Sequence, residues 1–263
     1  MTQVRRRLSL WLRALLVLVT GVMLAMPVMV SHYQQAHAPT PAIWPVPEDP
    51  VAARKARMIN HLLPLIQASN RALMEGRARL RNIHETILSG ARLSRREMRW
   101  LRQQADRYRL EPPQQNPPDD QFLGILERRM DLIPADLALA QAAMESAWGT
   151  SRFAREGNNY FGHWCYERGC GIVPARRAEG ARHEVARFRS AGQSVERYML
   201  NLNSHPRYQS LRVMRQRQRS QGKDPDGYAL AGGLEGYSSI GEDYVRAIRA
   251  LIRSNDLDRF PSL

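Results

Sequence analysis

Apolar residues repeat along most of the chain at the spacing of an α-helix. From about Val51 to Leu110, leucine, isoleucine and methionine recur every three or four residues, which predicts helices with one buried face. Ser94, with Glu97 three residues later, predicts a capped helix start within this region. Further helices are predicted at Gln121 to Met130 (capped by Asp119 or Asp120), Ser194 to Leu202, near Tyr208 to Gln218, and Glu242 to Ile252.

One further predicted helix is apolar on nearly every side. It covers the sequence LALAQAAMESAW, with Pro134 and Asp136 suited to its first turn and Gly149 suited to its C-cap. Glu145 is the one acid near its end. A helix without a polar face is expected to lie buried at the centre of its domain.

The residues from Tyr160 to Phe188 have a different pattern. Glycine, aromatic and β-branched residues replace the helical periodicity, and GIVPARRAEGARHEVARF predicts two short strands around a turn at Glu179-Gly180. The chain is therefore predicted to be mainly α, in the α+β class, with a small β-hairpin lobe.

The N-terminal region has the pattern of a targeting segment. Four arginines precede the almost wholly apolar run Ala14 to Val30, which is typical of an export signal or a membrane anchor. Ala36 to Ala38 offers a cleavage site, but Pro39 in the first mature position disfavours cleavage. We favour an uncleaved anchor in the inner membrane, with the rest of the chain on the periplasmic side. A cleaved signal and a soluble periplasmic protein form the alternative.

Composition divides the 263 residues into four parts. Residues 1–38 are the signal or anchor segment, and the proline-rich residues 39–50 form a semi-rigid linker. Residues 51–118 form a helical prefix to which we assign no site. Residues 119–263 form the principal domain.

Net charge narrows the choice of partners. The chain carries 39 Lys and Arg against 25 Asp and Glu, a net charge of +14, which indicates an anionic surface nearby. Nucleic acid, lipid headgroups and acidic wall polymer are all anionic and could all attract this chain. The export segment and the lack of a DNA-binding motif argue against nucleic acid.

Cys165 and Cys170 lie close together in a turn-rich segment. In an exported protein this predicts a disulfide that closes a small loop. His163 and His183 allow an alternative zinc site, although the spacing is loose for one, and two free thiols are a third interpretation. We favour the disulfide and expect no metal and no cofactor.

Glu145 is the candidate catalytic acid. It lies in the last turn of the apolar helix, where the helix dipole opposes ionisation, and Trp148 lies three residues on, within reach of its side chain. Apolar surroundings also disfavour the charged form, so both effects raise the pKa of Glu145. A glutamic acid that is protonated near neutral pH can donate to the leaving oxygen of a glycosidic bond, and Trp148 would bind the substrate. An ordinary helix-end carboxylate is the alternative.

The segment LAQAAMESAWGTSRFAREGNNYFG resembles the glucosaminidase family (glycoside hydrolase family 73), which cuts bacterial peptidoglycan, and in particular its Bax-type branch. The resemblance continues through CGIVPARRAEGARHEVARFRS, SVERYMLNLNSHPRYQSLR and LEGYSSIGEDYVRAIRALI, and covers roughly Leu132 to Ser254. It implies a lysozyme-like helical domain with a small β-hairpin lobe and a substrate cleft between the two. The membrane segment and the helical prefix would precede this domain.

The resemblance also implies roles for particular residues. Glu145 would be the catalytic acid, and Tyr237, in the sequence GYSS, would line the cleft near the cut bond. Family members commonly have Gly-Tyr-Ala-Thr-Asp there, so the serines depart from the pattern. Asn159, Phe161 and Gly162 would shape the cleft floor, although a turn with a buried aromatic is an equally good interpretation of these residues.

Several groups could act as the second catalytic group beside Glu145. A β-lobe glutamate usually follows a Thr-x-Glu pattern in the family, and this chain lacks that threonine. Glu179, at the predicted turn, and Glu184, on the return strand, are both candidates. The acetamide oxygen of the substrate could also attack the anomeric carbon, with Tyr237 positioning the acetamide.

These patterns predict an endo-acting β-N-acetylglucosaminidase that binds and cuts the glycan strands of peptidoglycan. A lytic transglycosylase or muramidase could use the same fold and the same single acid, but the Gly-Leu-Met-Gln run usual in transglycosylases is missing. A non-catalytic glycan-binding scaffold is the alternative from another class. Such a scaffold would be expected to have lost the catalytic acid, whereas this chain retains Glu145.

Overall fold

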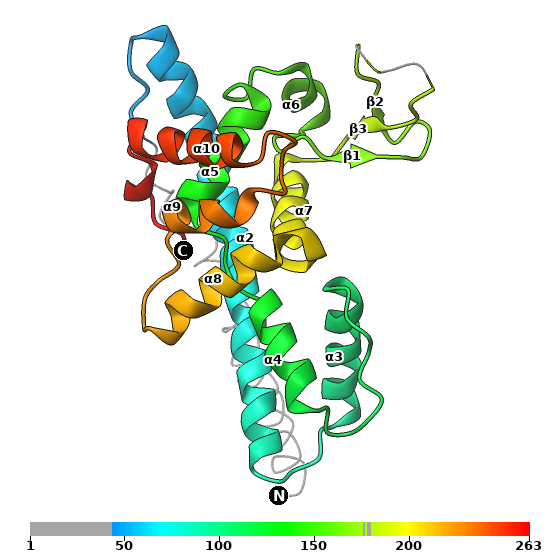
Figure 1. Cartoon of the computed structure of the whole chain (residues 1–263). Helices are drawn as coiled ribbons and strands as arrows, with labels where there is room; N and C mark the ends of the chain where they lie inside the picture. The colour runs from blue at the N-terminus through cyan, green and yellow to red at the C-terminus, as the bar shows by residue number, and fades with distance from the viewer. Residues whose placement is uncertain (1–43, 176, 178–179) are drawn as a thin grey trace, which may run out of the picture. The chain divides into compact units, whose positions relative to one another are not determined.

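The computed structural model describes residues 44–175, 177 and 180–263 (Figure 1). These residues are mostly helical and include a small three-stranded sheet, which fits the predicted α-rich, lysozyme-like fold. The predicted membrane segment, Ala14 to Val30, lies outside the described residues. Within the described part, no helix combines the length and the apolar character needed to cross a bilayer.

The longest described helix, α2 (Pro50–Leu88), connects two groups of helices (Figure 1). It packs against α5 (Ala135–Ser146) and α7 (Ala191–Ser204), and further along against α4 (Asp120–Arg129). Its C-terminal half shares an apolar cluster with α3 (Arg95–Arg107) and α4. The residues assigned to the helical prefix therefore pack directly on the principal domain.

The predicted capping residues begin the two short helices beside α2. Ser94 Oγ accepts the N–H of Glu97 (3.2 Å), and a carboxylate oxygen of Glu97 accepts the N–H of Ser94 (2.7 Å), which confirms the capping box of α3. At α4, the Asp119 carboxylate accepts the N–H of Phe122 (2.7 Å). Both caps satisfy N–H groups that have no partner within the helix.

Of the remaining helices, α9 (Gly227–Leu230) and α10 (Glu242–Ser254) pack directly against α5. Only Met144 and Glu145 in this helix are not fully buried, so the prediction of a central buried helix is confirmed. The C-terminal predictions correspond to α7, α8 (Gln209–Ser220) and α10 (Glu242–Ser254). Short helices that the sequence pattern did not predict are α6 (Arg152–Gly157), α9 (Gly227–Leu230) and the 3-10 helices Pro206–Tyr208, Ala231–Leu234 and Leu257–Arg259.

The β lobe lies beside α6 (Figure 1). Its described strands are β1 (Trp164–Cys165), β2 (Gly171–Ile172) and β3 (Glu184–Ala186), in the antiparallel order β1-β3-β2. The predicted hairpin is the pair β2 and β3, and β1 adds a strand that the sequence did not predict. Glu179, at the predicted turn, lies outside the described residues.

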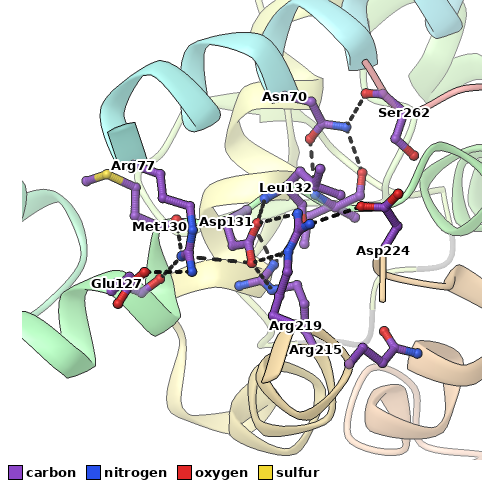
Figure 2. Close-up of polar contacts among 12 residues, drawn as sticks. Asn70, Arg77, Glu127, Met130, Asp131, Leu132, Arg215, Arg219, Asp224 and Ser262 are labelled. Atoms are coloured by element: carbon purple, nitrogen blue, oxygen red, sulfur yellow. Dashed lines mark hydrogen bonds and ion pairs between the residues drawn. The ribbon is translucent and has the colours of Figure 1, made fainter. Parts of the chain in front are cut away.

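A buried carboxylate fixes the segment that joins α4 to α5 (Figure 2). Asp131 is 3% exposed and lies among Arg77 of α2 and Arg215 and Arg219 of α8. Arg219 donates to both carboxylate oxygens (3.2 and 3.3 Å), and the other two guanidinium groups approach to 3.8 Å. Burial alone would raise the pKa of Asp131, but the surrounding positive charges lower it.

Side-chain hydrogen bonds also hold the backbone of the same segment. Arg215 donates to the carbonyl oxygens of Asp131 (3.3 Å) and Leu132 (2.8 Å). Asn70, on α2, accepts the N–H of Ile133 through its side chain (3.0 Å) and donates to the carbonyl oxygen of Ile133 (2.8 Å). These contacts determine where α5 begins.

Replacing Asp131 by Asn tests this network. The variant keeps the side-chain shape but removes the charge that Arg77, Arg215 and Arg219 share, and we expect the free energy of unfolding to fall by about 3–5 kcal/mol. Urea unfolding followed by circular dichroism measures the change. Asp224→Asn is the matched control, because Asp224 also pairs with Arg219 (3.1 Å) but its side chain is 99% exposed. We expect the control to lose less than about 1 kcal/mol.

The Asp131→Asn comparison also has an expected pH dependence. The pKa of Asp131 is lowered in the folded protein, so its stabilising contribution is complete above the unfolded-state pKa of about 4. The contribution is lost as the pH falls through the lowered folded-state pKa. The stabilities of wild type and variant should therefore converge in acid, and an equal difference at neutral and strongly acidic pH would contradict the assignment.

Candidate active site

The central helix α5 ends earlier than the sequence predicts. The backbone angle φ is +51° at Ala147, +59° at Trp148 and +77° at Gly149, so left-handed conformations begin directly after Ser146. The predicted C-cap at Gly149 is therefore wrong, and Ala147 caps the helix. Left-handed backbone costs a residue other than glycine about 1–2 kcal/mol, so this turn needs specific contacts to hold it.

Ser146 supplies those contacts. Its hydroxyl donates to the carbonyl oxygen of Ala142 (2.5 Å) and accepts the N–H of Gly149 (2.7 Å). Its own carbonyl oxygen accepts the N–H of Ser151 (2.9 Å), and the Ser151 hydroxyl in turn caps α6 by accepting the N–H of Ala154 (3.1 Å). The two serines of the E-S-x-W-G-x-S motif thus build the turn that follows Glu145.

Trp148 lies outside the helix as a result. Its predicted contact with Glu145 rested on helical spacing, and that spacing does not apply to a residue in the left-handed turn. The indole ring is half-buried and lies beneath the ammonium group of Lys55, which is 5.1 Å from the ring centroid. This cation–π contact joins the turn to the first part of α2.

Glu145 is half-buried at the last turn of α5. Its Oε1 atom accepts a hydrogen bond from the hydroxyl of Tyr244 in α10 (2.9 Å). Burial raises the pKa of Glu145, the hydrogen bond from Tyr244 opposes this, and the net shift is upward. The direction agrees with the sequence prediction, with burial as the largest cause.

A chain of buried polar groups leads to Glu145. Tyr198 donates through its hydroxyl to Oε1 of Gln141 (2.7 Å), and Nε2 of Gln141 donates to the hydroxyl of Tyr244 (3.0 Å). Because the Gln141 oxygen is engaged by Tyr198, its amide nitrogen must face Tyr244. The Tyr244 hydroxyl therefore accepts from Gln141 and directs its own proton to Oε1 of Glu145. When Glu145 is protonated, its acid proton belongs on the other oxygen, Oε2.

The Oε2 atom of Glu145 faces Gly162. A side-chain Cβ at Gly162 would lie 3.1 Å from this oxygen, and Gly162 itself is exposed with φ of +66°. The absence of a side chain at this position keeps that side of the carboxyl group accessible. Tyr237 donates its hydroxyl to the neighbouring carbonyl oxygen of Phe161 (3.0 Å), and Phe161 stacks on Tyr198 with ring centroids 4.0 Å apart. These contacts hold the Gly162 backbone beside Glu145.

Asn159 ties the same loop to the β lobe. The side chain is buried, and Nδ2 donates to the carbonyl oxygens of His163 (2.9 Å) and Ala186 (2.8 Å). Its Oδ1 accepts the N–H of His163 (3.1 Å). Both Asn159 and Phe161 thus support the backbone next to Gly162 with side chains that are themselves buried.

Cys165 and Cys170 form a disulfide in the β lobe. Their sulfur atoms and a Glu184 oxygen lie within 4.8 Å of one another, but sulfur atoms joined in a disulfide are not the thiolate ligands that a zinc site requires. Glu184 is buried, and its two oxygens accept the N–H groups of Gly169 (3.0 Å) and Gly171 (2.8 Å), which lower its pKa. Its carboxylate therefore braces the loop that the disulfide closes.

Sequence reasoning missed the residues that contact Glu145 from other helices. A signal for Tyr244 was available, because Tyr244, Ile248 and Ile252 share the buried face of α10 at helical spacing. Gln141, on α5 itself, is a buried amide in a largely apolar helix, and a buried amide requires hydrogen-bond partners. Neither signal identifies the partner, because the hydrogen bonds join residues 57 to 103 positions apart.

A described cavity lies away from Glu145, between α2, α3 and α7. Its volume is about 470 Å³, and its lining includes Leu73, Trp100 and Met199. Neither Glu145 nor Tyr244 lines it. The raised pKa and hydrogen-bond geometry, rather than cavity size, make Glu145 the candidate catalytic group.

Comparisons with known proteins agree on one family. The family model Glucosaminidase, described as mannosyl-glycoprotein endo-beta-N-acetylglucosaminidase, matches residues 125–257. Protein bax of Escherichia coli (strain K12) is 36% identical over 130 residues, which cover 49% of this chain and 46% of that protein. The match thus spans about half the length of each. No solved structure gives a significant match.

Replacing Tyr244 by Phe removes the hydrogen bond to Glu145, and we expect the pKa of Glu145 to rise further. A ¹³C-NMR titration of the glutamate carboxyl groups measures this, with the Glu145 resonance assigned by its loss in Glu145→Gln. Tyr237→Phe is the matched control, because that hydroxyl donates to Phe161. An unchanged midpoint in Tyr244→Phe, or an equal shift in both variants, would show that Tyr244 does not control the acid.

Proposed function

The chain belongs to the glucosaminidase family, and on that premise we propose that it is a glycoside hydrolase acting on bacterial peptidoglycan as an endo-β-N-acetylglucosaminidase. One observation carries the proposal. Glu145 is half-buried with a raised pKa, one oxygen is held by Tyr244, and the other faces exposed Gly162. A carboxyl group in this state can protonate a leaving glycosidic oxygen.

In the proposed mechanism, Glu145 donates the proton on Oε2. Burial favours the neutral form before the transfer, because a desolvated carboxylate is unfavourable. After the transfer, the Tyr244 hydroxyl stabilises the new negative charge through its bond to Oε1. Because Gln141 and Tyr198 are already oriented, this stabilisation requires little rearrangement.

The anomeric carbon needs a second group. Glu184 is bound through both oxygens by backbone N–H groups, which favours a structural role for it. Glu179 and the acetamide oxygen of the substrate are then the better candidates, with Tyr237 near enough to Glu145 to help position the acetamide. Retained activity in Glu179→Gln would favour the acetamide, and its loss would favour the carboxylate.

We further propose that the protein works on the periplasmic side of the inner membrane, anchored by residues 14–30. The basic residues before that apolar run support this location, as does the disulfide between Cys165 and Cys170, since disulfides persist in oxidising compartments. The net charge of +14 would hold the protein near carboxylate-bearing wall material.

Glu145→Gln tests the proposed activity. We expect fragment release from purified sacculi to fall by about 10²–10⁴-fold, the usual contribution of a general acid. Glu196→Gln is the matched control, because Glu196 is exposed on α7, and its activity should be unchanged. Activity that survives Glu145→Gln would show that the catalytic assignment is wrong.

The masses of the released fragments test the bond that is cut. A reducing N-acetylglucosamine end supports the proposed glucosaminidase activity. An anhydromuramic end would instead assign the protein to the lytic transglycosylases, with Glu145 still as the acid.

A further inference from the structure

Trp164 presents a large aromatic surface to solvent at the start of β1. The side chain is 57% exposed, an unusual position for a tryptophan with no apolar cover. The ring of His183 stacks against it, with centroids 4.2 Å apart and an angle of 15° between the planes. Since one indole face is covered by the imidazole, the exposed area includes the opposite face.

The lobe that carries Trp164 is braced on several sides. Trp164 pairs with Val185 in the sheet, and Cys165, the next residue, is joined to Cys170. Glu184 accepts the N–H groups of Gly169, inside the loop that the disulfide closes, and of Gly171, directly after it. The backbone that carries the indole is therefore fixed before any ligand binds, and the stacked ring of His183 restricts the indole itself, which reduces the entropy lost on binding.

Trp164 is also close to the candidate acid. Gly162, which borders Oε2 of Glu145, is two residues earlier, so the Cα atoms of Gly162 and Trp164 are at most about 7 Å apart. In an antiparallel sheet, residues directly opposite each other share a face, so Trp164, Val185 and Ile172 lie on the same face.

That face of the sheet is directed toward the helical part of the protein. Ile172 reaches to 3.1 Å from the position that a Cβ of Gly157 in α6 would occupy. Val185 is buried on the same face, whereas Trp164, on edge strand β1, is exposed. The exposed indole therefore lies on the sheet face that packs on α6, two residues along the chain from Gly162.

We propose that Trp164 is a stacking platform for a pyranose ring of the glycan strand, in a subsite next to the bond that Glu145 would cleave. The inference rests on the proposed function and extends it to a substrate-binding residue. An indole face carries partial negative charge, and the C–H groups on one face of a pyranose ring carry partial positive charge, so the two surfaces are complementary. Such a contact suits a neutral sugar and needs no charged group.

Binding of the linear β-1,4-linked tetramer of N-acetylglucosamine, measured by isothermal titration calorimetry, tests the platform. Full-length Glu145→Gln is the reference, so that the ligand is not consumed during the measurement. In this background, we expect Trp164→Ala to weaken binding about tenfold, equivalent to about 1.4 kcal/mol. Trp164→Phe keeps a smaller aromatic face and should recover part of the affinity.

Tyr166→Ala is the matched control. Tyr166 is 72% exposed on the same lobe but lies beyond the end of β1 and further along the chain from Gly162, so its removal should change affinity less than twofold. Circular dichroism and mass analysis of the Cys165–Cys170 bond establish that each variant keeps its fold. In the active protein, Trp164→Ala should raise KM more than it lowers kcat.

Two results would overturn the platform: tetramer affinity within twofold of the reference after Trp164→Ala, or no measurable tetramer binding while Trp164 is intact. Failure of the proposed function has a different signature, namely sacculus digestion that survives Glu145→Gln. Unchanged binding in Trp164→Ala together with lost digestion in Glu145→Gln would remove the platform and leave the hydrolase.

Discussion

The placement of the candidate site depends on one buried carboxylate. Asp131 is surrounded by guanidinium groups from α2 and α8, and two of these arginines, Arg77 and Arg215, also donate to backbone carbonyls of the segment that leads into α5. A buried charge is tolerated only when it is well paired, so this carboxylate favours the arrangement in which α2 and α8, which are far apart in sequence, meet beside it. The start of α5 is fixed in this way, and Glu145 lies ten residues after Ala135, on the last turn of the same helix.

The two ends of α5 show how environment sets the chemistry of an acid. Asp131 just before the helix and Glu145 in its last turn are both shielded from water, yet their pKa values move in opposite directions. Asp131 meets several positive charges and stays ionised, whereas the hydrogen bond to Glu145 comes from the neutral phenol of Tyr244. The first arrangement suits a structural anchor. The second suits a group that must hold a proton and then release it.

Local sequence patterns predicted what depends on local physics. Helical periodicity located the helices, Ser94 and Asp119 marked two helix starts, and the mixed aromatic and glycine composition marked the β lobe. The early end of α5 was not predicted, because it depends on how the Ser146 hydroxyl bonds to Gly149. The partners of Glu145 and the surroundings of Asp131 were not predicted either. Those contacts cross up to 103 positions, and an isolated acid or tyrosine in a sequence does not reveal which distant helix will face it.

The long helix α2 has a consequence for how the protein is made. Ribosomes produce α2 before the helices that pack on it. Two of these helices, α5 and α7, emerge only 47 or more residues after α2 ends, and the hydrogen bond from Lys55 to Asn255 must wait for 200 further residues. Side chains such as Leu62 and Ile66 are fully buried in the folded protein. Until α5 and α7 have been synthesised, these side chains lack the helices that cover them. Exposed apolar surface favours aggregation, so the interval before α7 has been synthesised is the one in which shielding of this helix by chaperones would matter most.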